Sequence, residues 1–154
     1  MQRHEIYTPP FFLFNGHLET IYPSLFRKVE EKPFLNERII TVDDDFLDVY
    51  LFTQYSRQVV IISHGLEGSA WRPYVTGMVN ACYNAGFDVI TWNFRSCGSE
   101  LNRQLRFYHS GATEDLDAII QFAAARGYAS INLIGFSLGG NMTLKYLGEK
   151  RSIH

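Results

Sequence analysis

The chain has 154 residues, of which 46% are hydrophobic and 19% are charged, and its formal net charge is −2. This length and balance suit one globular domain with a real core. The charge balance argues against nucleic acid as a partner, and the apolar runs are too short for a transmembrane segment. The two cysteines, Cys82 and Cys97, have no disulfide or metal-ligand spacing. We therefore expect a cytoplasmic setting, no metal and no organic cofactor.

Four prolines interrupt residues 1–36. Because proline excludes a regular helix, we expect this stretch to form an irregular leader that packs on the domain. The domain itself is expected to span residues 37–154. Within the leader, residues 9–14 (Pro-Pro-Phe-Phe-Leu-Phe) are strongly apolar. Packing across the domain is the favoured role for them, and contact with a membrane or an acyl substrate is the alternative.

Two strands are expected at residues 38–42 and 46–53, and three aspartates at positions 43–45 join them. Aspartate favours turns, so this segment predicts a solvated hairpin turn. A cation site is the alternative reading, but no further ligands are spaced nearby.

Strands and helices alternate after the hairpin. Residues 59–62 are a continuous apolar run, as expected for a strand that is covered on both faces. Apolar residues over 75–82 recur at helical spacing, and Gly86 stands where that helix should end. Further strands are expected at 87–94 and 130–135, and further helices at 114–123 and 137–147. About five strands and three helices in this order predict an α/β fold, with a mostly parallel sheet and helices on both faces.

A glycine-flanked serine follows the last expected strand. Residues 135–139 read Gly-Phe-Ser-Leu-Gly and lead into the last expected helix. In this frame the pattern is typical of a nucleophile elbow, which exposes a serine hydroxyl on a sharp turn. Ser137 is therefore the expected nucleophile of acyl transfer, and the backbone N–H of Leu138 is an expected oxyanion donor. A turn of purely structural use is the alternative.

A second glycine-rich loop follows the strand at 59–62. Residues 64–69 read His-Gly-Leu-Glu-Gly-Ser, in the place from which a second oxyanion donor is expected. The backbone N–H of Leu66 is the candidate, and an ordinary glycine-rich turn is the alternative. His64 lies in this loop and precedes the serine, so we expect it to orient the loop rather than act as the base.

Four residues are expected to contact the substrate: His64, Gly65, Arg95 and Asn141. Arg95 follows an expected parallel strand at its carboxyl end, where ligands bind in open α/β sheets. A structural salt bridge is an equally good reading of Arg95.

The remaining chemical candidates favour structural roles. Asp115 lies in the first turn of a helix, where an acid suits the helix dipole. His17 and His109 are expected to be structural, and His154 would have to fold back from a chain end. Cys97 is a weak nucleophile candidate because nothing nearby activates it.

Taken together, five segments resemble the YheT-type branch of the α/β-hydrolases over nearly the whole chain. They are residues 15–20, 64–69, 93–95, 108–111 and 135–141. The resemblance implies an eight-stranded, mostly parallel sheet and hydrolysis of carboxylic esters, including short-acyl or lipid esters. It also implies that Ser137 is the nucleophile and that the Leu66 and Leu138 amides form the oxyanion hole.

The resemblance also implies that two catalytic groups lie elsewhere. In this fold the acid and the histidine follow the serine, whereas only residues 138–154 follow Ser137 here, and they contain no aspartate. We therefore expect an incomplete α/β-hydrolase fold with an open fifth-strand edge, and poor ester turnover by this chain alone. The alternatives are a non-catalytic remnant that binds an acyl ligand or a partner chain through that edge, and an active site completed by a second chain.

Overall fold

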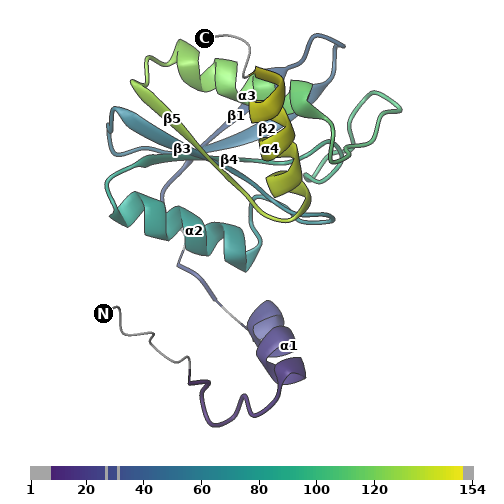
Figure 1. Cartoon of the computed structure of the whole chain (residues 1–154). Helices are drawn as coiled ribbons and strands as arrows, with labels where there is room; N and C mark the ends of the chain where they lie inside the picture. Colours follow the sequence, from purple (N-terminus) through teal and green to yellow (C-terminus); the bar gives the residue numbers. More distant parts are fainter. Residues whose placement is uncertain (1–7, 27, 31, 151–154) are drawn as a thin grey trace.

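A computed structural model of the chain describes residues 8–26, 28–30 and 32–150. Its strands are β1 (Leu35–Ile40), β2 (Phe46–Phe52), β3 (Gln58–Ser63), β4 (Asp88–Trp92) and β5 (Ser130–Gly135). Its helices are α1 (Gly16–Phe26), α2 (Pro73–Asn84), α3 (Thr113–Ala125) and α4 (Leu138–Lys150). The strands form one sheet in the order β1-β2-β4-β3-β5, with α2 on one face and α3 and α4 on the other (Figure 1).

The sheet is mixed. β3 pairs in parallel with β4 and β5, whereas β2 runs antiparallel to both β1 and β4. The expected α/β architecture with helices on both faces is thus confirmed, but parallel pairing is limited to β4, β3 and β5. The first hairpin makes the difference, because a short turn can join only antiparallel neighbours. Within the described residues β5 pairs with β3 alone, so it lies at the sheet edge.

Two apolar cores lie on the two faces of the sheet. Val60 and Ile62 of β3 pack toward α2. Val59 and Ile61 pack on the opposite face, toward α3 and α4, because alternate residues of a strand point to opposite sides. The buried helical partners are Val75 and Val79 on one face, and Leu116, Ile119, Ala123, Met142 and Tyr146 on the other. Burial from both sides explains why β3 is a continuous apolar run.

The expected end of a helix at Gly86 is confirmed, and α3 ends in the same way at Gly127. Gly86, two residues after α2, has φ 91°, and Gly127, two residues after α3, has φ 79°. This left-handed backbone is open to glycine and terminates a helix.

The prediction of an irregular leader over residues 1–36 is wrong for α1 and for the start of β1 at Leu35. The side chain of Asn15 caps α1, because its Oδ1 accepts the N–H of Leu18 at 2.9 Å. Pro23 lies inside this helix, where it removes one backbone donor without ending the helix. The asparagine cap therefore stabilises a helix that one internal proline does not end.

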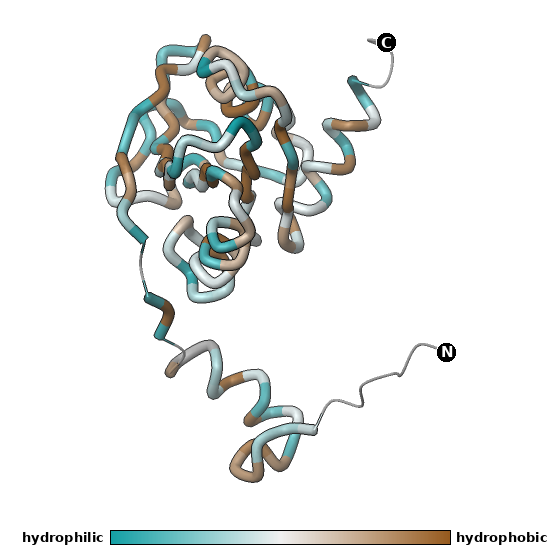
Figure 2. The backbone as a smooth tube through the Cα atoms, turned by 90° about the vertical axis from the view of Figure 1, so that its left-hand side faces the viewer, coloured by the Kyte–Doolittle hydropathy of each residue, from teal (hydrophilic) through white to brown (hydrophobic). Residues whose placement is uncertain are grey.

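Aromatic side chains collect in the N-terminal segment. Phe11, Phe12 and Phe14 are exposed, and the rings of Phe12 and Tyr22 contact each other edge to face. In the views shown, α1 lies on the side of α2 that faces away from the sheet (Figures 1 and 2). No helix within the described ranges is long and apolar enough to cross a bilayer.

Candidate active site

Ser137 lies on the sharp turn between β5 and α4. Its φ is 52°, in the left-handed region that favours glycine. The side chain is exposed, and its hydroxyl has no hydrogen-bond partner among residues 8–26, 28–30 and 32–150. The backbone oxygen of Ser137 accepts the N–H of Asn141 at 3.0 Å, inside the first turn of α4. A free hydroxyl is thus held at the N-terminus of a helix.

Two glycines make this turn possible. A Cβ built on Gly135 would lie 2.4 Å from the carbonyl oxygen of Gly139. A Cβ built on Gly139 would lie 2.4 Å from the carbonyl oxygen of His64. No side chain fits at such distances, so both positions require glycine. The turn is thereby packed against α4 and against the loop that follows β3.

The loop after β3 lies directly beside Ser137. A Cβ built on Gly65 would lie 3.3 Å from the Cβ of Ser137, and the N–H of Phe136 donates to the oxygen of Ser63 at 3.0 Å. The Leu66 side chain is 65% exposed. Across the described part of the chain, the backbone N–H groups of Leu66 and Leu138 have no acceptor. Two unpaired donors therefore lie on the two segments that meet at Ser137.

His64 is buried and has both ring nitrogens occupied. Its Nδ1 lies 2.7 Å from the oxygen of Gly65, and its Nε2 accepts the N–H of Phe94 at 3.2 Å. A carbonyl acceptor requires the proton on Nδ1, so the ring is neutral, and burial lowers its pKa. The prediction that His64 contacts the substrate is wrong, because its relative exposure is 0%. It holds the loop instead, as its position before the serine indicated.

Arg95 is also buried and serves the structure. Its guanidinium pairs with both oxygens of Asp115, at 2.9 and 2.7 Å. The same group reaches Asp43 at 2.8 Å and Asp45 at 2.9 Å. Hydrogen bonding to Asp115 raises the pKa of Arg95, and hydrogen bonding to Arg95 lowers the pKa of Asp43 to about 2. With 2% exposure, Arg95 cannot bind a substrate, so that prediction is wrong and the salt-bridge reading holds.

The aspartate turn was expected to be solvated, and this prediction is wrong for one of its three residues. The turn itself is confirmed, with Asp44 at φ 56°, but Asp45 is fully buried. Besides Arg95, its carboxylate accepts the amide of Asn102 at 2.9 Å and the N–H of Arg103 at 3.0 Å. No cluster of His, Cys, Asp and Glu that could hold a metal occurs within the described ranges.

Asn141 lies one turn of α4 beyond Ser137. Its side chain is exposed and donates to the oxygen of Ser110 at 3.2 Å. This bond ties α4 to the loop before α3. Contact of Asn141 or of Gly65 with a substrate stays a prediction.

The other candidate groups lie as follows. His109 is exposed, and its Nδ1 accepts the N–H of Gly111 at 3.1 Å. His17 is exposed on α1, and His154 lies outside the described residues. Burial raises the pKa of the Cys97 thiol, which makes it a poor nucleophile.

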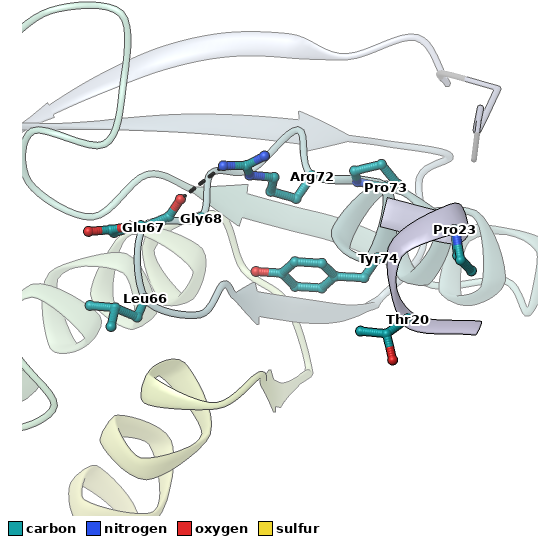
Figure 3. A pocket seen from close by; sticks show the side chains of 8 residues that line it. All are labelled: Thr20, Pro23, Leu66, Glu67, Gly68, Arg72, Pro73 and Tyr74. Atoms are coloured by element: carbon teal, nitrogen blue, oxygen red, sulfur yellow. Dashed lines mark hydrogen bonds between the residues drawn. The ribbon is translucent and has the colours of Figure 1, made fainter. Parts of the chain in front are cut away.

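Two clefts flank the loop after β3. The first, which we call the α1 cleft, has a volume of about 500 Å³. It is lined by Thr20, Pro23, Leu66, Glu67, Gly68, Arg72, Pro73 and Tyr74 (Figure 3). The second, of about 540 Å³, is lined by Glu67, Gly68, Ser69, Arg72, Ser96, Cys97, Phe107 and Tyr108. Ser137 lines neither cleft, but Leu66 lines the first, so the α1 cleft adjoins the free donor beside the serine.

Sequence reasoning missed two tyrosines that hold the loop. The hydroxyl oxygen of Tyr74 accepts the N–H of Gly65 at 2.9 Å, and that of Tyr108 accepts the N–H of Glu67 at 2.9 Å. Tyr108 belongs to one of the segments that carried the resemblance, which was a usable signal. For Tyr74 the only local signal is its place beside Pro73 at the start of a helix.

Comparison with known proteins decides the family. A family profile described as alpha/beta hydrolase fold matches residues 58–153. The chain belongs to this family. It is 38% identical to Escherichia coli YheT, which is named as an esterase, over 88% of this chain and 42% of YheT. It is 26% identical to human phospholipase ABHD3, over 94% of this chain and 38% of that protein.

Solved structures share the fold of this alpha/beta hydrolase. The Pyrococcus furiosus esterase Pf2001 superposes with a TM-score of 0.69 at 24% identity, over 78% of this chain and 48% of the esterase. The 38% identity with YheT confirms the expected resemblance to the YheT-type branch. The chain spans 42% and 38% of the lengths of its two named relatives.

Proposed function

We propose that this chain carries the nucleophile of a serine hydrolase that cleaves carboxylic esters, with lipid or short-acyl esters as substrates. The observation that carries the proposal is the exposed Ser137, held at φ 52° on a turn that two glycines keep tight. A strained backbone at an exposed hydroxyl is a feature of functional sites. The names of the relatives, an esterase and a phospholipase, support ester chemistry.

The chemistry would follow the acyl-enzyme route. The Oγ of Ser137 forms a bond to the ester carbonyl carbon, and the carbonyl π electrons move to the oxygen as a negative charge. The N–H groups of Leu66 and Leu138 are the proposed donors to that oxyanion. When the carbonyl re-forms, the bond to the alkoxide breaks, and the alkoxide leaves as an alcohol with the proton that Ser137 gave up. Water then releases the acid and restores the serine.

A general base must carry that proton, and we propose that it is an imidazole, oriented by a carboxylate, outside residues 8–150. None of the three described histidines hydrogen-bonds to the Ser137 hydroxyl: His64 has both ring nitrogens occupied, His109 accepts the N–H of Gly111, and His17 is exposed on α1. A triad that lacks members retains only about 10³–10⁴-fold catalysis over water. We therefore expect this chain alone to turn over esters poorly.

The α1 cleft is the proposed site for the acyl group. Leu66, Tyr74, Pro23 and Pro73 give it a largely apolar lining next to the proposed oxyanion donor. We also propose a cytoplasmic setting, because Cys82 and Cys97 are free thiols.

The test is covalent labelling of Ser137. The purified chain is treated with a fluorophosphonate, whose phosphorus the serine oxygen attacks with loss of fluoride, and labelled peptides are located by mass spectrometry. We expect slow labelling at Ser137 and none in Ser137→Ala. Ser96→Ala is the matched control, because Ser96 also has a positive φ, of 61°, but lies outside the turn between Gly135 and Gly139. Labelling that is absent, or that persists in Ser137→Ala, contradicts the proposal.

A binding role is the second candidate function. β5 pairs only with β3 among the described residues, and an open strand edge can accept another chain. In that case the chain would self-associate or bind a partner through β5 while Ser137 stays unreactive. Light scattering beside the labelling experiment separates the two functions.

A further inference from the structure

Three consecutive backbone N–H groups in the loop after β3 differ in whether they have a hydrogen-bond acceptor. The first, of Gly65, donates to the hydroxyl of Tyr74 at 2.9 Å. The third, of Glu67, donates to the hydroxyl of Tyr108 at 2.9 Å. The middle one, of Leu66, has no acceptor within the ranges that the structure describes. The loop is thus held on both sides of one unpaired donor.

The backbone conformation of this loop is not one that its own residues favour. The N–H of Gly68 closes a tight turn onto the oxygen of Gly65 at 3.1 Å, and Glu67 takes φ 50° within it. A turn of this kind normally has glycine or asparagine at the left-handed position. Glutamate there is strained, so groups outside the turn must maintain it. The phenol that receives the Glu67 N–H belongs to Tyr108.

Each tyrosine is itself fixed by an aromatic neighbour at the site. The ring of Tyr74, on α2, packs edge to face on Phe136 with centroids 4.9 Å apart. Phe136 directly precedes Ser137, so Tyr74 connects the loop to the serine turn. The ring of Tyr108 packs on Phe94 at 5.4 Å, and Phe94 lies 4.0 Å from the ring of His64.

Gly68 allows the first tyrosine to approach. A Cβ built on Gly68 would lie 2.8 Å from the hydroxyl oxygen of Tyr74 and 2.9 Å from Nδ1 of His64. The absence of a side chain at this position thus brings a phenol and an imidazole against the same turn. In Figure 3 the Tyr74 ring points from α2 toward the part of the loop that carries Leu66 and Gly68.

We propose that Tyr74 and Tyr108 are positioning residues, which clamp the loop so that the Leu66 N–H points at the oxyanion formed on Ser137. This inference rests on the proposed function. An oxyanion donor must lie about 2.7–3.1 Å from the charged oxygen. A misplacement of about 1 Å can cost 10²-fold in rate. Burial raises the pKa of Tyr108, so its surroundings favour the neutral hydroxyl.

The kinetic test uses Tyr74→Phe and Tyr108→Phe, which remove one oxygen and keep the ring contacts. Fluorophosphonate labelling of Ser137 is followed over a range of probe concentrations, which separates reversible binding from bond formation. We expect the bond-forming rate constant to fall about 10- to 100-fold in each variant, with binding changed less than about twofold. Tyr83→Phe is the matched control, because Tyr83 also lies on α2 and its hydroxyl donates to Thr53, at 3.3 Å, away from the site.

NMR chemical shifts distinguish a positioning role of the tyrosines from a role in fold stability. The same measurement can be made on the unmutated chain. In the phosphonylated protein the phosphoryl oxygen stands in for the oxyanion. The Leu66 N–H resonance should then move downfield with that of Leu138. In Tyr108→Phe the Leu66 movement should shrink while the Leu138 movement stays. A residue that only stabilised the fold would leave both movements intact.

The outcomes are distinct. If Ser137 reacts and the two tyrosine variants match Tyr83→Phe, the clamp is overturned and the proposed function stands. The clamp is likewise overturned, and the proposed function kept, if the Leu66 resonance does not move in the unmutated chain after labelling. If Ser137 does not react in the unmutated chain, the proposed function fails, and the clamp fails with it.

Discussion

Gly139 of α4 lies directly against His64, so that a Cβ built on Gly139 would come within 2.4 Å of the His64 carbonyl oxygen. Through this contact the helix that begins after Ser137 touches the loop that carries Leu66. The two proposed oxyanion donors therefore belong to segments whose separation is set by a backbone contact. Any side chain at position 139 must push those segments apart.

We expect Gly139→Ala to lower the free energy of unfolding by at least about 2 kcal/mol, because backbone rather than a flexible side chain must move. Gly148→Ala is the matched control on the same helix, since no atom lies within 4 Å of its added Cβ. That control should raise the free energy of unfolding by about 0.5–1 kcal/mol, through helix propensity. Denaturant unfolding of the two variants measures both effects, and equal effects would contradict the close contact.

The sheet and its covering helices were predictable from sequence because their signals are local. The apolar run at 59–62 and the helical spacing at 75–82 each report burial on the faces that the structure shows. The serine turn was also predictable, because the contact between Gly135 and Gly139 lies within one short segment, whereas the contact of Gly139 with His64 was not predictable. Local features of this kind can be predicted from periodicity and residue spacing alone.

The partners of Arg95 could not be read in the same way. Asp43 and Asp115 lie 52 and 20 residues away in the chain, and only the folded topology brings them together. The same holds for Tyr108, which reaches Glu67 across 41 residues. Contacts between distant loops produce no periodic pattern in the sequence. The sequence could therefore indicate a salt bridge for Arg95 but could not identify its acidic partners.

Replacement of Arg95 should destabilise the fold strongly. We expect Arg95→Met to cost about 3–5 kcal/mol, because Asp45 and Asp115 would be left as buried charges without a cation. Arg103→Met is the control, since the pair with Asp44 is exposed and contributes about 1 kcal/mol or less. Chemical denaturation measures both variants. A cost below about 1 kcal/mol for Arg95→Met would contradict the role of Arg95 as the cation that these buried carboxylates require.

His64 should make the stability of the fold depend on pH. Burial lowers its pKa from 6.5 in the folded state, so the unfolded chain takes up the proton first as the pH falls. The stabilisation is complete above pH 6.5 and is lost as the pH falls toward the lower folded pKa. The free energy of unfolding should rise with pH in this window, with a slope of at most about 1.4 kcal/mol per pH unit, the value for one proton. Unfolding is measured between pH 6.5 and about pH 5, above the range of most carboxylates.

The control for this pH dependence is a second histidine substitution. His64→Gln should remove the slope in that window, whereas His109→Gln should keep it, because His109 is exposed and lies outside the loop. A slope that survives in His64→Gln would assign the titration to another group.

Ser137 should be held in place at a cost in stability. An L-residue in the left-handed region costs roughly 1–2 kcal/mol, and Ser137 has φ 52°. We therefore expect Ser137→Gly to be about 1 kcal/mol more stable than Ser137→Ala. The same pair of changes at Ser130, in β5, should have the opposite order, because glycine weakens a strand by about 0.5–1 kcal/mol relative to alanine. Thermal unfolding of the four variants gives both differences. If glycine has no advantage at position 137, the turn is relaxed, and the strain that supports a functional serine is absent.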